Sequence, residues 1–154
     1  TQDAGVIRMA AADVEPASAF ETALDVPGAA EVPGTGLVVS AEVGAVTPGE
    51  LAGLRAGADA VAVQGVDTAR LTVRSRRPGD ALRPLGGPGR RKLQDVFVDR
   101  KVARAERDRV PVVVDDRGRI VWVVGHTIAD EFRVTSPEGR VLLLKVRRAG
   151  VPVK

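Results

Sequence analysis

The chain has 154 residues, which suits one domain or a small domain with an extended arm. It contains no cysteine, which excludes disulfides and thiolate-bound zinc or iron–sulfur sites, and no run of about 18 apolar residues that would span a membrane. The net charge of +3 hides a strong polarity. Residues 71–111 carry twelve basic and five acidic side chains, whereas residues 1–70 carry three basic and ten acidic ones. Such polarity is typical of a domain that faces a polyanion, and a chain without cysteine fits the cytoplasm.

The first part of the chain predicts an arm followed by strands. Residues 1–19 are rich in alanine and predict an arm or the tail of a preceding region. Because the chain begins with Thr1 rather than Met, we expect it to be a piece of a longer protein. Alternating apolar residues predict a strand at Phe20–Val26, and Pro-Gly turns separate it from a second strand at Leu37–Val43. The frequent Gly, Pro and Ala would also suit disorder, but the regular spacing of strands and turns argues against it.

The middle of the chain predicts short strands, a loop and a helix. Thr47 begins a pattern of helix-capping residues, although the glycines that follow leave a loop equally open. Short strands are predicted at Ala60–Gln64 and Leu71–Arg74, and Pro78–Pro88 predicts a loop rich in Pro and Gly. Apolar residues at helical spacing then predict a helix at Arg91–Arg100, whose Leu and Phe should pack on a sheet.

The last part predicts a helical turn and two hairpins. The turn covers Arg104–Arg109 and ends at Pro111. The first hairpin joins 112–115 to 120–124 through an Asp-Asp-Arg-Gly turn, with Trp122 in the core. The second joins 132–135 to 141–146. Together with the abundance of valine, these elements predict an α+β fold that is mainly β, with small antiparallel sheets in a sandwich-like arrangement and one or two short helices.

The loop and the helix that follows it carry the chemistry that best suits an anion. Glycines before a helix N-terminus expose backbone N–H groups, and arginine can donate two hydrogen bonds to one phosphate. The alternative is a solvated charged surface with local ion pairs, such as Arg91 with Asp95 and Asp99, or Arg104 with Asp108. The chain lacks the aromatic side chains on which single-stranded bases stack, so any RNA contact should be to the backbone and shape of a duplex.

Enzymatic motifs are weak in this chain. It has no Gly-Lys pair for a nucleotide-hydrolysing phosphate loop, and Gly86-Gly87 does not have the spacing of a dinucleotide-binding motif. His126 is the single histidine, which makes a poor catalytic triad or metal site, and turn formation explains Asp115 and Asp116. A free-standing enzyme would need polar groups that converge on His126 or Asp115, and it is the least favoured of the alternatives.

A family resemblance becomes specific between residues 74 and 133. The matching positions are Arg74-Ser-Arg-Arg-Pro-Gly-Asp80, Arg83-Pro-Leu-Gly86, Gly89, Arg91-Lys-Leu93, Asp95, Phe97, Asp99-Arg-Lys-Val102, Arg107, Pro111 and Ile120-Val-Trp-Val-Val-Gly125. With this pattern the chain resembles the C-terminal domain of bacterial tRNA(Ile)-lysidine synthetases. A weaker similarity includes Val26-Pro27-Gly28 and extends over most of the chain. One departure is Ala103, where the family usually has a proline that would fix the backbone.

The resemblance implies a role in tRNA modification. The family uses ATP, with magnesium, and lysine to convert the wobble cytidine of an isoleucine tRNA with a CAU anticodon into lysidine. The catalytic motif, Ser-Gly-Gly-any-Asp-Ser, belongs to an N-terminal domain and is absent here, so we expect this chain to hold no cofactor and to catalyse nothing alone. By resemblance, it grips the acceptor stem of the tRNA. The implied fold is a β-rich module related to one in the phenylalanyl-tRNA synthetase β chain.

These implications divide the chain into an arm (1–19), a β-rich leading segment (20–70) packed on the rest, and a tRNA-binding domain (71–154). Two glycines, Gly86 and Gly89, would let the backbone approach the RNA. Asp80 and Asp95 should bind backbone or Arg groups within the loop, and Arg107 should be structural and pair with an acidic neighbour. The expected partners are the tRNA and the N-terminal catalytic domain of the same protein. The phosphate contacts are expected from Arg76, Arg77, Arg90, Arg91, Lys92, Lys101 and Arg104.

One alternative is a docking or dimerisation domain without direct RNA contact. In that case the basic surface would meet carboxylates of the catalytic domain or of a second subunit. A homodimer is compatible with either function.

Overall fold

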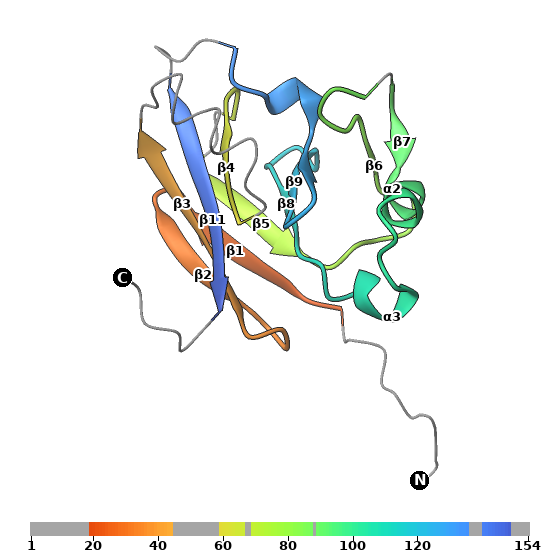
Figure 1. The fold of residues 1–154 in the computed structure, drawn as a ribbon. Coiled ribbons are helices and arrows are strands. Elements are labelled where there is room, and N and C mark those ends of the chain that lie inside the picture. Colours follow the sequence, from red (N-terminus) through yellow and green to blue (C-terminus); the bar gives the residue numbers. More distant parts are fainter. Residues whose placement is uncertain (1–18, 45–58, 67–68, 88, 136–139, 149–154) are drawn as a thin grey trace, which may run out of the picture.

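The computed structural model describes residues 19–44, 59–66, 69–87, 89–135 and 140–148. Two antiparallel sheets form most of this part of the chain (Figure 1). The five-stranded sheet has the order β1 (Glu21–Asp25), β5 (Arg70–Arg74), β8 (Val112–Val114), β9 (Ile120–Val123) and β10 (Thr127–Ile128). The four-stranded sheet has the order β2 (Gly28–Val32), β3 (Leu37–Gly44), β11 (Val141–Arg148) and β4 (Ala60–Val63).

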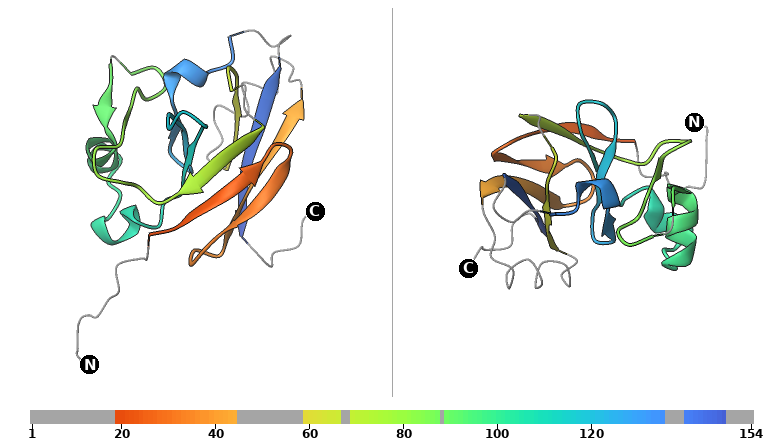
Figure 2. Two further views of the ribbon diagram at one scale, coloured as in Figure 1. Left: turned by 180° about the vertical axis from the view of Figure 1, so that it is seen from behind. Right: turned by 90° about the horizontal axis from the view of Figure 1, so that it is seen from above.

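A small ribbon and the two α-helices lie apart from the four-stranded sheet. The ribbon pairs β6 (Ala81–Leu82) with β7 (Arg91–Lys92), and the helical elements are α2 (Leu93–Asp99), α3 (Arg104–Arg107) and the 3₁₀ turn η1 (Asp130–Phe132). Figures 1 and 2 show α2, α3 and the ribbon together at one end of the molecule, and β2, β3 and β11 at the other. None of the described helices is long and apolar enough to cross a membrane.

One apolar core joins the two sheets and α2. The inward residues of β3 and β11 (Val39, Ala41, Leu142 and Leu144) belong to the same cluster as Leu71 and Val73 of β5. Trp122 of β9 and Phe97 of α2 are almost completely buried in that cluster. A leucine or valine buried in this way contributes roughly 1.5–3 kcal/mol. The predicted packing of the helix on a sheet and the predicted burial of Trp122 are confirmed.

The fold class predicted from the sequence is also confirmed: the structure is rich in antiparallel strands and has two short α-helices. The strands predicted in the first half correspond to β1, β3, β4 and β5, and the first predicted hairpin corresponds to β8 and β9. The strand β2 was not predicted. Its sequence, Gly-Ala-Ala-Glu-Val, has weak β-propensity, and it forms because it pairs with β3 over its whole length.

Two expectations need correction, and three others lie outside the described residues. The prediction of a second hairpin is wrong: β11 pairs with β3 and β4, and Phe132 lies in η1 rather than in a strand. The predicted helix at 91–100 begins two residues late, at Leu93, because Arg91 and Lys92 pair with Leu82 and Ala81. The capping pattern at Thr47, the arm before Ala19 and the turn at 136–139 lie outside the described residues.

Candidate nucleic-acid interface

A buried ion pair shapes the loop that follows β5. The guanidinium of Arg74 donates two hydrogen bonds of 2.9 Å to the two carboxylate oxygens of Asp80 and one of 3.0 Å to the carbonyl of Ser75. The side chains of Arg74 and Asp80 are only 7% and 12% exposed. Asp80 also accepts the backbone N–H of Arg77 at 2.7 Å, and its carbonyl accepts the N–H of Leu93 at 2.9 Å. The pair therefore ties the loop to the start of α2, as expected for Asp80.

This loop forms one wall of a concave surface of about 350 Å³. We call this surface the basic concavity; it is lined by Arg76, Arg77, Pro78, Gly79, Asp80, Lys92, Leu93, Gln94 and Asp108. Three of the seven cations predicted to bind phosphate are thus brought together. Arg76 pairs with Asp108 at 2.8 Å, and Arg77 pairs with Glu21. Lys92 is exposed and forms no ion pair with any described residue.

The other four predicted cations do not line the basic concavity. Arg91 is paired with Asp99, and the hydrogen bond to that carboxylate raises the pKa of the guanidinium. Arg90, Lys101 and Arg104 are exposed, and their side chains form no hydrogen bond or ion pair within the described part of the chain. Of the ion pairs considered as an alternative, that of Arg91 with Asp99 is present, whereas Asp108 binds Arg76 rather than Arg104.

The glycine loop does not lead directly into the helix, because β7 lies between them. Gly86 has a positive φ of 74°, and its N–H donates a hydrogen bond of 3.1 Å to Oδ1 of Asp130. That bond is the main reason why the pKa of Asp130 is lowered, and Arg133 and Arg83 lower it further. At the helix start, the Leu93 N–H donates to the carbonyl of Asp80 and is bonded within the chain. Whether Gly86 and Gly89 let the backbone approach an RNA stays a prediction.

The residues considered for catalysis have structural partners. Nδ1 of His126 accepts a hydrogen bond of 3.1 Å from Nε of Arg100, and the imidazole meets the ring of Phe97 edge-on at 5.9 Å. Burial, and then the charge of Arg100, lower the pKa of His126. Asp115 accepts backbone N–H groups of Arg117 and Arg119 within its turn, which fits the predicted turn role. Within the described ranges, no three His, Cys, Asp or Glu side chains gather in a way that could hold a metal ion.

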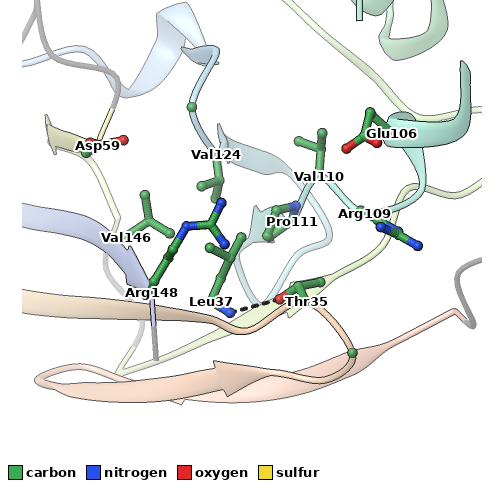
Figure 3. A pocket seen from close by; sticks show the side chains of 12 residues that line it. Thr35, Leu37, Asp59, Glu106, Arg109, Val110, Pro111, Val124, Val146 and Arg148 are labelled. Atoms are coloured by element: carbon green, nitrogen blue, oxygen red, sulfur yellow. Dashed lines mark hydrogen bonds between the residues drawn. The ribbon is translucent and has the colours of Figure 1, made fainter. Parts of the chain in front are cut away.

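A second, slightly larger concavity of about 390 Å³ lies between the two sheets and contains none of the predicted site residues. Figure 3 shows Arg148 directed into it, with Arg109, Glu106 and Asp59 also on its lining. The charges of its two arginines equal those of its two carboxylates. In the basic concavity, each carboxylate is already paired with an arginine. We therefore assign the candidate interface to the basic concavity, because its Lys92 is not balanced.

Arg107 has a structural role, but its bonding partner differs from the expected one. Its Nε donates a hydrogen bond of 3.0 Å to the carbonyl of Val102, not to an acidic neighbour. The bond joins α3 to the turn after α2, and it places Asp108 where it pairs with Arg76. Asp108 and Gln94 were not among the predicted site residues. Arg76 and Asp108 are 32 positions apart, so no local pattern could reveal their contact.

A comparison with known proteins decides the family. A crystal structure of a TILS C-terminal domain superposes with a TM-score of 0.68 and 32% sequence identity, over 86% of this chain and 99% of that one. The family model described as the TilS substrate C-terminal domain matches residues 71–144. The chain belongs to the TilS C-terminal domain family. The resemblance inferred from the motif between residues 74 and 133 is thereby confirmed.

Full-length relatives of this TilS C-terminal domain are tRNA(Ile)-lysidine synthases. That of Symbiobacterium thermophilum is 37% identical over 80% of this chain and 25% of its own length. That of Caldanaerobacter subterraneus subsp. tengcongensis is 40% identical over 49% of this chain and 16% of its own length. The chain therefore spans about a sixth to a quarter of the length of these curated relatives.

Proposed function

We propose that this chain is the tRNA-binding domain of a tRNA(Ile)-lysidine synthase. In the proposed protein, an N-terminal catalytic domain uses ATP and magnesium in the cytoplasm to convert the wobble cytidine of an isoleucine tRNA with a CAU anticodon to lysidine. The domain described here grips the acceptor stem and holds the tRNA in register. Membership of the TilS C-terminal domain family supports this proposal.

The observation that carries the assignment is the position of Lys92 in the basic concavity. Its ammonium group has no carboxylate partner among the described residues, and Arg76 and Arg77 line the same surface. An RNA phosphate would meet Lys92 directly and could draw Arg77 from its exposed pair with Glu21, whose side chains are both more than half exposed. Exposed pairs of this kind contribute at most about 1 kcal/mol, so exchange for a phosphate is inexpensive.

The unpaired cations Arg90, Lys101 and Arg104 extend the proposed contact beyond the basic concavity. With Lys92 they give four cations that have no ion-pair partner among the described residues and can meet phosphates. Each phosphate contact steepens the dependence of log K on log salt by roughly 0.9 on duplex DNA, so four contacts predict a slope of about −4. The exposed surface has few aromatic side chains, which favours contact with the backbone of a duplex over stacking with single-stranded bases.

The test is a salt titration of binding between the 154-residue chain and isoleucine tRNA with a CAU anticodon, beside the same tRNA without its acceptor stem. We expect a steep slope that is lost with the stem. Lys92→Glu should weaken binding and reduce the slope by about 1 or more. The matched control is Lys145→Glu, because Lys145 is also exposed but lies on β11 at the other end of the molecule.

One observation favours a second candidate, a docking domain without RNA contact. Arg76, Arg77 and Arg91 are already paired with carboxylates, which shows that this basic surface can satisfy itself with protein groups. In that case the chain would bind no tRNA at any salt concentration, and Lys92→Glu would weaken its association with the catalytic domain instead.

A further inference from the structure

Leu85 is an exposed apolar side chain at the tip of a firmly held turn. It is 37% exposed, and only Val43 and Val98 share this property among the large apolar residues of the described part of the chain. Unlike Val98 on α2, Leu85 projects from the turn formed by residues 83–87, which we call the Leu85 turn. A single exposed leucine is common on protein surfaces, so we infer a partner from the fixed position of the turn and from the cations near it.

Backbone hydrogen bonds fix the Leu85 turn at several points. The N–H of Gly87 closes the turn on the carbonyl of Pro84 at 2.8 Å, and Gly86 has the positive φ that such a turn requires at its third residue. The N–H of Leu85 donates to the carbonyl of Ile128 at 3.1 Å, and Pro84 forms a β-bridge with Ala129. The turn is thus an extension of the β9–β10 region and not a free loop.

Asp130 anchors the same turn from below. The backbone N–H of Asp130 donates to the carbonyl of Arg83 at 2.7 Å, and its carboxylate accepts the N–H of Gly86. Asp130 is buried and also binds Arg133 at 2.8 Å. The carboxylate is therefore fully used in holding the turn, and Leu85 is presented in one position.

The surroundings of Leu85 are cationic. Arg83 is about half exposed; its Nε donates to the carbonyl of Gly87 and lies 3.7 Å from Oδ2 of Asp130, while its terminal amino groups form no hydrogen bond with any described residue. Arg90 is exposed and lies just before β7. On η1, the Asp130 carboxylate is bonded within the turn, and Glu131 lies 3.6 Å from the guanidinium of Arg119. An apolar tip on a turn that also carries Arg83, with the exposed Arg90 a few positions further along the chain, suits a partner with a flat apolar surface flanked by phosphates.

The β6–β7 ribbon connects the Leu85 turn to the basic concavity. Leu82 pairs with Arg91 and Ala81 pairs with Lys92, so the turn continues one end of the ribbon and Lys92 lies at the other. A β-strand rises about 3.3 Å per residue, so the ribbon separates the Leu85 turn from the basic concavity by only the length of a few nucleotides of one RNA strand. A duplex bound at the basic concavity could therefore end at Leu85.

We propose that the Leu85 turn caps the open end of an RNA duplex. Leu85 packs on the outer face of the terminal base pair, and Arg83 and Arg90 contact phosphates on either side of it. Apolar side chains that pack against bases are known from proteins that insert them between base steps. The inference rests on the proposed RNA-binding function, and it assigns to Leu85 the recognition of a duplex end rather than of the duplex backbone.

The test compares two RNAs with the same duplex. One is a short hairpin with an open blunt end, and the other has that end closed by a second loop. The 154-residue chain should bind the open hairpin about three- to tenfold more tightly, because part of a leucine side chain is removed from water on the base pair. Leu85→Ala should abolish this preference without changing affinity for the closed RNA. Leu85→Met should keep it, and Val98→Ala, the matched exposed apolar control, should have no effect.

Two results would overturn the inference: equal binding of both RNAs by the unaltered chain, or an equal loss on both RNAs in Leu85→Ala. The salt dependence of binding distinguishes a failure of the capping role from a failure of the proposed function. Steep salt-dependent binding of both RNAs without an end preference removes the capping role alone. Absence of binding to either RNA and to tRNA removes the RNA-binding function, and the capping role with it.

Discussion

Asp80 receives two parallel hydrogen bonds of 2.9 Å from the guanidinium of Arg74, and neither side chain is more than 12% exposed. The same carboxylate accepts the backbone N–H of Arg77. The first segment of the family motif therefore begins and ends, at Arg74 and Asp80, with two residues that bind each other. Their role is to fix the loop that presents Arg76 and Arg77 to the basic concavity.

Replacement of Asp80 should destabilise the fold strongly. In Asp80→Asn, the buried guanidinium of Arg74 loses its only carboxylate partner among the described residues, and a broken buried pair lowers the free energy of unfolding by about 3 kcal/mol or more. The single tryptophan, Trp122, is buried and reports unfolding by fluorescence in urea. We expect the urea midpoint to fall with little change in the slope of the transition.

The pair of Arg70 with Asp25 is the matched control. It has the same chemistry, but each side chain is 69% exposed, and exposed pairs contribute at most about 1 kcal/mol. Asp25→Asn should therefore shift the urea midpoint much less than Asp80→Asn. Equal shifts in the two variants would show that the Arg74–Asp80 pair does not stabilise the loop.

Lys101 occupies a backbone position that normally favours glycine. Its φ is 59°, its N–H donates to the carbonyl of Val98, and the next N–H, of Val102, donates to the carbonyl of Phe97. These two bonds form a Schellman motif, in which the left-handed residue is usually glycine. A chain with lysine at this position is less stable than one with glycine by about 1 kcal/mol, which suggests that the exposed cation of Lys101 serves binding.

Lys101→Gly should therefore stabilise the chain and weaken RNA binding at once. We expect the free energy of unfolding to rise by about 0.5–1 kcal/mol, because the strain is relieved. The slope of log K against log salt should become shallower by about 1. Lys101→Ala separates the two effects, since it removes the cation but retains the strained φ. If Lys101→Gly binds tRNA as tightly as the unaltered chain, Lys101 contacts no phosphate.

Asp130 gives a prediction on pH and on the Leu85 turn. Its pKa is lowered, chiefly by the hydrogen bond from Gly86, so its contribution to stability is fully present above the ordinary aspartate pKa of about 3.9. That contribution is lost as the pH falls through the lower pKa of the folded state. Asp130→Ala should speed exchange of the Gly86 amide proton with solvent. Asp130→Asn keeps an oxygen that can accept this N–H and should protect it better than Asp130→Ala does. Equal exchange in the two variants would mean that the carboxylate does not hold the turn.

Local turn chemistry explains most of what the sequence predicted. The turn at 115–118 is set by Asp115, whose side chain accepts backbone N–H groups two and four residues later, and such patterns are visible in the sequence. The pairing of strands was less accessible. β11 lies between β3 and β4, about 100 and 80 residues away along the chain, so its apolar pattern indicated a strand but not its partners.

The sequence predicted which residues of the candidate interface are cationic, but not how these residues are arranged. Arg76, Arg77 and Lys92 were recognised as cations, yet the contacts of Arg76 with Asp108 and of Arg77 with Glu21 join positions 32 and 56 residues apart. Only the fold reveals that Arg91 turns to Asp99 while Lys92, on the opposite side of the same strand, enters the basic concavity.

His126 gives the last prediction, and it is the only histidine in the chain, so its titration can be followed alone. Burial, and then the charge of Arg100, hold its pKa below 6.5. Because the unfolded chain binds the proton more readily, stability is greatest above the unfolded pKa and decreases as the pH falls from 6.5 to the folded pKa. Protonation would also place a donor on Nδ1, which now accepts the hydrogen bond of Arg100.

An NMR titration of the His126 ring should therefore give a midpoint below 6.5. In Arg100→Gln the midpoint should rise but stay below that value, because burial is the larger cause and remains in place. Urea midpoints measured at about pH 7.5 and about pH 5.5 should differ for the unaltered chain and differ less for His126→Gln, whose amide oxygen can accept the Arg100 bond but takes up no proton in this range. A ring that titrates at or above 6.5 would show that His126 is not held neutral between α2 and the β9–β10 turn.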